Sequence, residues 1–224
     1  MKNQPAKPAS EISPVWAKIS LSAIIVFMIL LTLLHLLKPE LDSSWRMISE
    51  YAIGKFGWLM NIAFILWAIS FLGLFFSIRS QIHTKIGRIG LVLLLISALG
   101  LLIAGLFTTD PVTASADQRT TNGMLHSVGG TLGMAMPFAA LFLYFSLRKN
   151  PRWQIKKKSL KFASFLAVTG FVLAFVSTGY FLFQSNGIFS ESTPVGFPNR
   201  LEVLCYCIWL IIFSKQAMNM RTTN

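Results

Sequence analysis

The chain has 224 residues, a formal net charge of +12 and a mean hydropathy of +0.62. Hydrophobic residues make up 54% of it and charged residues only 12%, whereas about a quarter of the residues in a soluble domain are charged. This composition excludes an ordinary water-soluble domain. It also leaves no room for a separate soluble catalytic domain, so we expect one membrane domain.

Six apolar segments account for most of the chain. A helix needs about 20 apolar residues to cross a hydrocarbon layer of about 30 Å, and five segments meet this requirement: Trp16–Leu37, Gly57–Ile78, Ile89–Phe107, Met124–Leu147 and Phe162–Phe183. The sixth, Leu201–Phe213, reaches membrane length only when Phe197–Arg200 are included. We therefore predict an all-α, six-helix transmembrane bundle at 16–216, with polar tails at 1–15 and 217–224.

The distribution of charge predicts the orientation. Lysine and arginine concentrate in the N-terminal tail, in the connections 79–88 and 148–161, and at the C-terminus, whereas every acidic residue except Glu11 lies on the opposite side. Basic connections stay in the cytoplasm, so we expect both termini to be cytoplasmic in the cell (cytoplasmic) membrane. The 148–161 connection is interpreted as a topological anchor in preference to a site for anionic lipid, and nucleic-acid binding is not expected because no binding module surrounds it.

Small residues and one proline predict how the helices pack. Gly129 with Gly133, and Gly100 with Ala104, are pairs at helical spacing that let two helix backbones approach closely in lipid. Pro137 lies four residues after Gly133 and removes that carbonyl's helical partner, which predicts a bend in the fourth helix.

Ionisable side chains are absent from the centres of the spans and gather at their extracytoplasmic ends, which argues against a proton-driven or voltage-driven transporter. The topology places five of them at one depth: Glu50, Asp110, His126, Arg200 and Glu202. We expect them to share one site.

Each of these side chains has a functional and a structural interpretation. His126 shares a helical face with glycines and Pro137, so it is expected to point inward as a general base or metal ligand, or to be held by a hydrogen bond. Asp110 either pairs with His126 or Arg200, or begins a turn before Pro111. Arg200 either grips an anion or pairs with Glu50 or Asp110. Asn199 and Glu202 match a capping box after Pro198, the interpretation favoured for Glu202.

Three segments together resemble a known family. They are Trp45–Gly54 before the second span, Gly105–Pro111 after the third and Gly123–Gly129 opening the fourth. Their order is similar to that of the integral-membrane family catalogued as domain of unknown function 998. The resemblance implies a six-helix protein without an assigned activity, with Ser49 and Glu50, Asp110 and His126 at the family's polar positions. Glutamate stands at position 50 where aspartate is often seen, which adds one methylene group.

Three functions remain open. The leading hypothesis is a site for a small ligand or lipid headgroup, formed by Ser49, Glu50, Asp110, His126, Asn199 and Arg200, with Arg200 gripping an anion. The second is a membrane-embedded, possibly metal-assisted hydrolase that uses His126 and Asp110. The third is a structural or accessory subunit. Membrane lipids are the expected partners, and the sequence assigns no metal, cofactor or oligomeric state.

Overall fold

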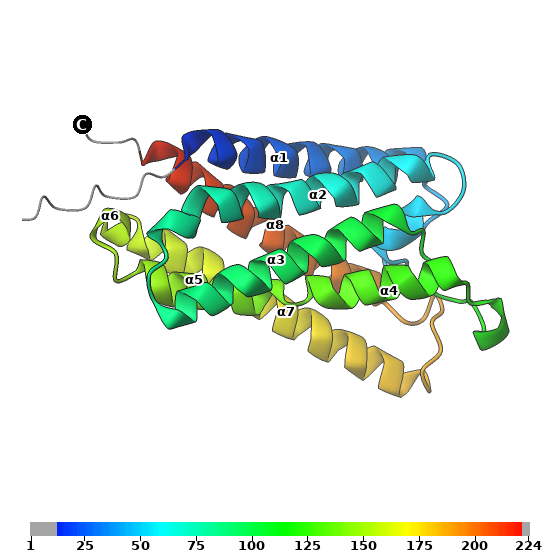
Figure 1. The fold of residues 1–224 in the computed structure, drawn as a ribbon. Helices are drawn as coiled ribbons and strands as arrows, with labels where there is room; N and C mark the ends of the chain where they lie inside the picture. The colour runs from blue at the N-terminus through cyan, green and yellow to red at the C-terminus, as the bar shows by residue number, and fades with distance from the viewer. Residues whose placement is uncertain (1–12, 221–224) are drawn as a thin grey trace, which may run out of the picture.

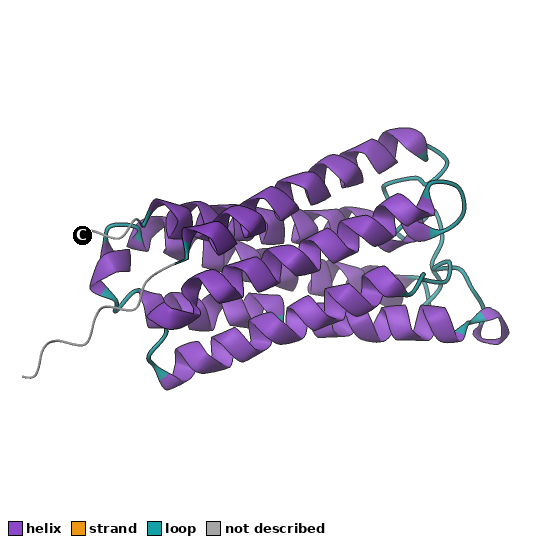
Figure 2. Cartoon of the chain, turned by 45° about the horizontal axis from the view of Figure 1, so that its top comes forward, coloured by secondary structure: helices purple, strands orange, loops and turns teal. Residues whose placement is uncertain are grey.

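A computed structural model describes residues 13–220, and all regular structure within that range is helical (Figures 1 and 2). The α-helices are α1 (Pro14–Leu37), α2 (Gly57–Ile78), α3 (Lys85–Leu106), α4 (Thr121–Gly133), α5 (Met136–Leu147), α6 (Pro151–Gln154), α7 (Lys157–Gln184) and α8 (Gly196–Asn219). Three short 3-10 helices lie between them: η1 (Ile48–Ala52), η2 (Arg79–Gln81) and η3 (Ala116–Gln118). The parts of the predicted tails at 1–12 and 221–224 lie outside the described residues.

The predicted six-helix membrane bundle is confirmed. Six helical stretches within residues 13–220 are long and apolar enough to span a membrane. The fourth is formed by α4 and α5 together, Thr121–Leu147. The sixth is longer than its apolar core indicated, because α8 begins at Gly196 and ends at Asn219.

The helices form a ring around a common core. α1 packs against α2, α2 against α3, α3 against α4 and α5, α5 against α7, α7 against α8, and α8 against α1. At one end of the bundle α5 links α3 to α7. At the other end α4 packs chiefly against α3, and α7 diverges from it (Figure 1).

The two predicted small-residue pairs pack against each other. A Cβ built on Gly100 would lie 2.5 Å from the carbonyl oxygen of Gly129, and one built on Gly129 would lie 2.7 Å from the backbone nitrogen of Ala104. No side chain fits between α3 and α4 at this point. The two backbones therefore touch, as such pairs allow in lipid.

The predicted bend at Pro137 is also confirmed. α4 ends at Gly133, a turn follows at Met134 and Ala135, and Pro137 lies in the first turn of α5. The amides of Met134 and Ala135 bond carbonyls three residues back instead of four. Proline is tolerated there because the first turn of a helix needs no amide donor.

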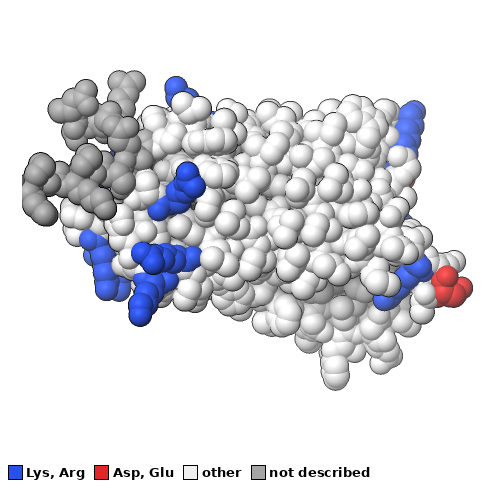
Figure 3. Space-filling model, viewed as in Figure 1, with Lys and Arg blue, Asp and Glu red and all other residues white. Residues whose placement is uncertain are grey.

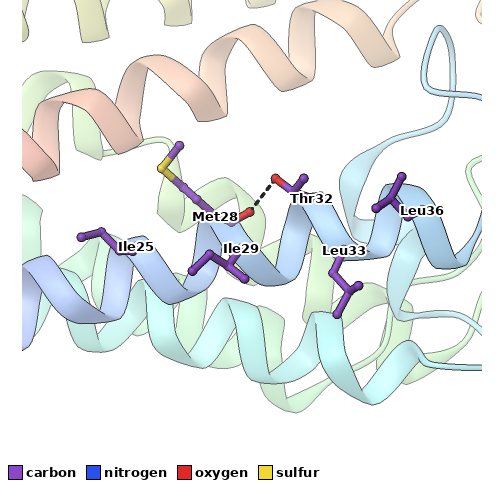
Figure 4. A pocket seen from close by; sticks show the side chains of 6 residues that line it. All are labelled: Ile25, Met28, Ile29, Thr32, Leu33 and Leu36. Atoms are coloured by element: carbon purple, nitrogen blue, oxygen red, sulfur yellow. Dashed lines mark hydrogen bonds between the residues drawn. The ribbon is translucent and has the colours of Figure 1, made fainter.

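The sides of the bundle present an apolar surface suited to lipid. Lysine and arginine lie toward the two ends of the face drawn in Figure 3, and the middle of that face is free of charged side chains. A shallow groove on α1 is lined by Ile25, Met28, Ile29, Thr32, Leu33 and Leu36 (Figure 4). The Thr32 hydroxyl donates to the Met28 carbonyl at 2.9 Å, so its polar atom needs no partner from lipid.

Serine side chains join three helices in the interior. Ser20 of α1 donates to the carbonyl oxygen of Ser70 in α2 at 2.7 Å, and its hydroxyl lies 2.7 Å from that of Ser214 in α8. All three serines are fully buried. They act as interhelical hydrogen-bonding contacts of the kind found inside membrane bundles.

We expect Gly129→Ala to destabilise the bundle. Its methyl group would lie 2.6 Å from the carbonyl oxygen of Gly100, and such overpacking costs about 1–3 kcal/mol. The thermal unfolding midpoint of the purified protein should fall. Gly179→Ala is the matched control, because an added Cβ there meets nothing within 4 Å. Equal midpoints for the two variants would contradict the close contact between α3 and α4.

Candidate functional site

All acidic residues among positions 13–220 lie at the end of the bundle formed by the loops 38–56, 107–120 and 185–195, here named the acidic end. The opposite end, which carries the connections 79–88 and 148–161, is named the basic end. The structure separates the predicted site residues of the acidic end into a group that ties loops and helices together and a group that lines a cavity.

Glu50 ties two loops together. Its carboxylate is buried, and Oε1 accepts hydrogen bonds from Arg46 Nη1 at 2.8 Å and from the Val112 amide at 3.0 Å. Oε2 accepts from the Met47 amide at 3.0 Å. Arg46 and Met47 belong to the 38–56 loop and Val112 to the 107–120 loop. These three hydrogen bonds fix η1, which contains Glu50, against the 107–120 loop. Removing one partner of a buried charged network is costly.

Arg200 ties α8 to α1 and to the 38–56 loop. Its Nε donates to His35 Nε2 at 2.9 Å, and Nη2 donates to the Tyr51 hydroxyl at 3.2 Å. Nη1 donates to the carbonyl oxygens of Arg46 and Gly196. All three guanidinium nitrogens thus have protein acceptors. Arg200 pairs with neither Glu50 nor Asp110, and its geometry gives no support to the anion grip that we predicted.

Lys38 completes this network. It follows α1 directly, is buried, and its Nζ donates to the carbonyl oxygens of Tyr51 and Ile53. Burial lowers the pKa of Lys38 from its ordinary value, while the negative charges of Glu40 and Glu50 oppose that effect. The lysine therefore supplies hydrogen-bond donors to the carbonyls at the end of η1.

Asp110 caps the start of α4. It lies in the loop after α3, where Oδ2 accepts from the Thr120 amide and Oδ1 from the Thr120 hydroxyl, both at 2.8 Å. Thr120 in turn accepts from the Gly123 amide as the N-cap of α4. A carboxylate is favourable at a helix N-terminus. Asp110 bonds neither His126 nor Arg200, and its carboxylate bonds Thr120 and not a turn at Pro111, so this capping contact is neither of the two predicted roles.

His126 is held in a defined tautomer. Its Nδ1 lies 2.9 Å from the carbonyl oxygens of both Ala104 and Phe107. Carbonyl oxygens only accept, so Nδ1 is a donor, and in the neutral imidazole Nε2 is the nitrogen with the lone pair. No residue in 13–220 bonds Nε2. The imidazole is 6% exposed and lies edge-on to the Phe64 ring, so the structure leaves one basic nitrogen available.

A cavity of about 360 Å³ lies between α2, α3, α4, α8 and η1, here named the polar cavity. One side is apolar and includes Phe64, Trp67, Phe71, Leu101 and Val203. The polar side includes Ser49, His126, Asn199, Glu202 and Tyr206. Three of the predicted site residues, Ser49, His126 and Asn199, therefore share this cavity.

Several polar atoms of the cavity lining have no protein partner within residues 13–220. Asn199 Oδ1 accepts from the Ile48 amide, but its amide nitrogen has no acceptor. Glu202 Oε1 accepts from the Tyr206 hydroxyl at 2.7 Å, and Oε2 has no donor. The Ser49 hydroxyl has no partner, and the indole nitrogen of Trp67 is buried without an acceptor.

The capping box predicted at Asn199 and Glu202 is wrong. α8 begins at Gly196, with Val195 at the N-cap position and no side-chain cap. Pro198 lies within the first turn, where its missing amide is not needed, so the helix starts before the residue that was expected to cap it. Both polar side chains are consequently inside the helix and turned to the cavity lining.

A second space adjoins the polar cavity at the acidic end. This cleft, named the acidic-end cleft, measures about 340 Å³ and shares Met47, Ser49, Thr109 and Ser127 with the cavity lining. Glu50 and Asp110 line it, so both predicted residues lie beside the polar cavity and not in its lining. The exposed Arg119 also lines it. Arg119 supplies the cationic side chain of this cleft.

The described residues offer no preformed metal site. No group of three or more histidine, cysteine, aspartate or glutamate side chains within 13–220 is close enough to hold an ion. Cys205 and Cys207 are buried and unbonded. The metal-assisted form of the hydrolase hypothesis therefore gains no support from the arrangement of side chains.

Residues 21–215 match the family described as Protein of unknown function (DUF998). The chain belongs to that family. The resemblance that the sequence motifs indicated is thus confirmed over most of the chain. No curated protein and no solved structure matches it.

Sequence reasoning missed several residues of the cavity. Trp67 and Tyr206 sit inside apolar spans, where an aromatic residue is the common lipid or core side chain. Glu202 was assigned to a cap. Tyr206 lies four residues after Glu202, on the same helical face, and this spacing was the signal in the sequence for their hydrogen bond.

Glu50→Gln should lower the stability of the folded protein by loosening the loops at the acidic end. Glu50 is not part of the polar-cavity lining. An amide group cannot accept all three donors that the carboxylate accepts, and hydrogen bonds to charged groups contribute about 1.5–3 kcal/mol. We expect a free-energy loss of that size in denaturant unfolding. Glu40→Gln is the control, because Glu40 is exposed at the same end. If the two variants unfold at the same denaturant concentration, Glu50 does not hold the loops.

Proposed function

We propose that this DUF998 protein binds an amphipathic small molecule or a lipid headgroup in the polar cavity. The observation that carries the proposal is that unpartnered polar atoms line both sides of one space: part-exposed ones of Ser49, Asn199 and Glu202 on the polar side, and the buried indole nitrogen of Trp67 on the apolar side. Buried polar atoms in folded proteins are normally paired. A ligand that supplies the missing partners would satisfy this rule.

The size and lining of the cavity support a small ligand. Small-molecule sites enclose about 300–1,000 Å³ and combine apolar walls with a few convergent polar groups. The polar cavity has about 360 Å³ and fits that description. Its aromatic wall, with Phe64, Trp67 and Phe71, suits an apolar chain or ring, and the polar wall suits a headgroup.

The charge of the lining favours a headgroup with hydrogen-bond donors. Glu202 is the acidic side chain of the cavity, and its lining contains no lysine or arginine. With Glu202 ionised and His126 neutral, Glu202 Oε2 and His126 Nε2 are both acceptors. A hydroxyl or amino group fits them better than the anion that we first expected for Arg200. An anionic part of the ligand would instead meet Arg119 in the acidic-end cleft.

The charge distribution supports an extracytoplasmic position for this site. The basic residues of the connections 79–88 and 148–161 favour a cytoplasmic position for the basic end. With that orientation both termini are cytoplasmic and the acidic-end cleft opens to the extracytoplasmic side. The ligand would enter from that side or from the outer leaflet.

Filling the cavity tests binding directly. Gly130 lines the cavity, and an added Cβ there meets nothing within 4 Å, so Gly130→Leu should fold and occupy ligand space. The purified protein would be incubated with a total membrane lipid extract, and retained molecules identified by mass spectrometry. We expect Gly130→Leu to retain about tenfold less of the wild-type ligand.

Gly179→Leu is the matched control, because Gly179 is equally open but lies on α7 outside the cavity. It should retain ligand as the wild type does. Equal retention by both variants, or no specific retention by the wild type, would contradict a binding site and favour the structural or accessory function.

A hydrolase remains the second candidate because Ser49 and His126 share the cavity. Ser49 has a hydroxyl without a protein partner, and His126 Nε2 also lacks one; a serine hydrolase pairs these two groups, although no hydrogen bond joins them in this structure. Asp110 does not orient His126, whose Nδ1 is held by main-chain carbonyls instead.

A fluorophosphonate probe separates the two candidates. A hydrolase predicts covalent labelling that is abolished by Ser49→Ala and strongly reduced by His126→Ala. Ser127→Ala is the control, because Ser127 lines the same cavity but donates its hydroxyl to the Gly123 carbonyl. Absence of labelling in the wild-type protein would remove the hydrolase candidate.

A further inference from the structure

A groove at the basic end has an unusual combination of side chains. It has a volume of about 530 Å³ and runs between the start of α7 and the end of α8. We name it the basic groove; its lining is Lys156, Lys158, Ser159, Phe162, Ile212, Lys215, Gln216 and Asn219. Three lysines from two separate segments of the chain thus converge on one space.

These lysines have no carboxylate partner among the described residues. None of the three forms an ion pair or side-chain hydrogen bond within 13–220. The sequence contains no acidic residue between Asp117 and Glu191 and none after Glu202. Glu11, the acidic residue expected on the same side, lies outside the described residues. Positive charge in a concave site, here unpaired within 13–220, favours an anion.

Gln216 points to a ligand independently of charge. It is 8% exposed, lines the groove, and its buried Oε1 has no hydrogen-bond partner. Its amide nitrogen also lacks an acceptor in residues 13–220. An unpaired amide buried at this depth is costly, so a bound polar group is the natural partner for it.

The groove also has an apolar side that faces the lipid. Phe162 is 61% exposed, and Ile212 lies beside it in the lining. Phe162 lies one helical turn beyond Lys158, where α7 passes from the charged segment into its apolar span. A molecule that fits both sides has an anionic head and an apolar chain.

We propose that the basic groove binds the phosphate of an anionic glycerophospholipid in the leaflet at the basic end. The three lysines and the Ser159 hydroxyl contact the phosphate, Gln216 bonds the headgroup, and an acyl chain runs over Phe162 and Ile212. This site is separate from the polar cavity: Asn199 and Lys215 are both on α8, and 16 residues of helix place them roughly 24 Å apart along its axis.

The test uses the full-length protein purified in a neutral detergent and titrated with short-chain phosphatidylglycerol, with binding measured by native mass spectrometry. The groove variant is Lys156→Gln, Lys158→Gln and Lys215→Gln together. Each lysine near a lipid phosphate is expected to contribute about fivefold to affinity, so the triple variant should bind roughly a hundredfold more weakly.

The control variant removes the same charge from the same end. Lys85, Lys149 and Lys157 are exposed and outside the groove lining, so replacing all three with glutamine should change affinity less than about threefold. Gln216→Leu keeps every charge and should still weaken binding several-fold. It also serves as the test if the triple variant fails to fold.

Three results would overturn the proposal. An equal loss of affinity in the groove and control variants would mean that the lysines act only as diffuse charge. Binding of inorganic phosphate as tight as that of phosphatidylglycerol, with the same lysine dependence, would assign the groove to a soluble anion. Equal affinity for phosphatidylcholine would likewise exclude recognition of anionic lipid.

Discussion

Every polar group within the six spans has to find its hydrogen-bond partner inside the protein, because the lipid interior offers none. The serines shared by α1, α2 and α8 and the Thr32 hydroxyl on the lipid face follow this constraint. Four buried side-chain atoms in the described chain have no partner: those of Asn61, Trp67 and Gln216 in the spans, and that of Trp153 in α6 between them. Trp67 lines the polar cavity and Gln216 the basic groove, so two of the four exceptions mark the sites proposed for ligands. Asn61 and Trp153 line neither, and nothing in the structure explains them.

At the acidic end, residues that are adjacent in the sequence have different structural roles. Ser49 and Glu50 are adjacent in the chain, yet Ser49 lines the cavity while the Glu50 carboxylate joins two loops. In the same way His126 presents a free nitrogen to the cavity, and Asp110 caps the helix that carries it. The polar positions of the family motif thus include both the side chains of a candidate site and those that fix its shape. The α3–α4 contact at Gly100 and Gly129 supports both, because it sets the position of α4.

The sequence predicted the features that depend on one segment at a time. Hydropathy located the spans, Pro137 located the bend, and the glycine pairs located the contact between α3 and α4. Features that depend on which helices become neighbours were not accessible. Arg200 bonds His35, which is far away in the sequence, and the start of α8 is set by loop packing, with the Gly196 amide bonded to Ser44. As a result, Arg200 is not part of the cavity lining, whereas Glu202 is.

The central claim is that the polar cavity opens on the side of the membrane opposite the basic connections. The most direct measurement is labelling of Ser49→Cys in intact cells with a small, membrane-impermeant thiol reagent, since the native Cys205 and Cys207 are buried and should give little background. Lys149→Cys, at the basic end, is the reference. The account predicts that position 49 reacts in intact cells and that position 149 reacts only after the membrane is permeabilised. Labelling of position 149 in intact cells, or none at position 49 under either condition, would contradict it.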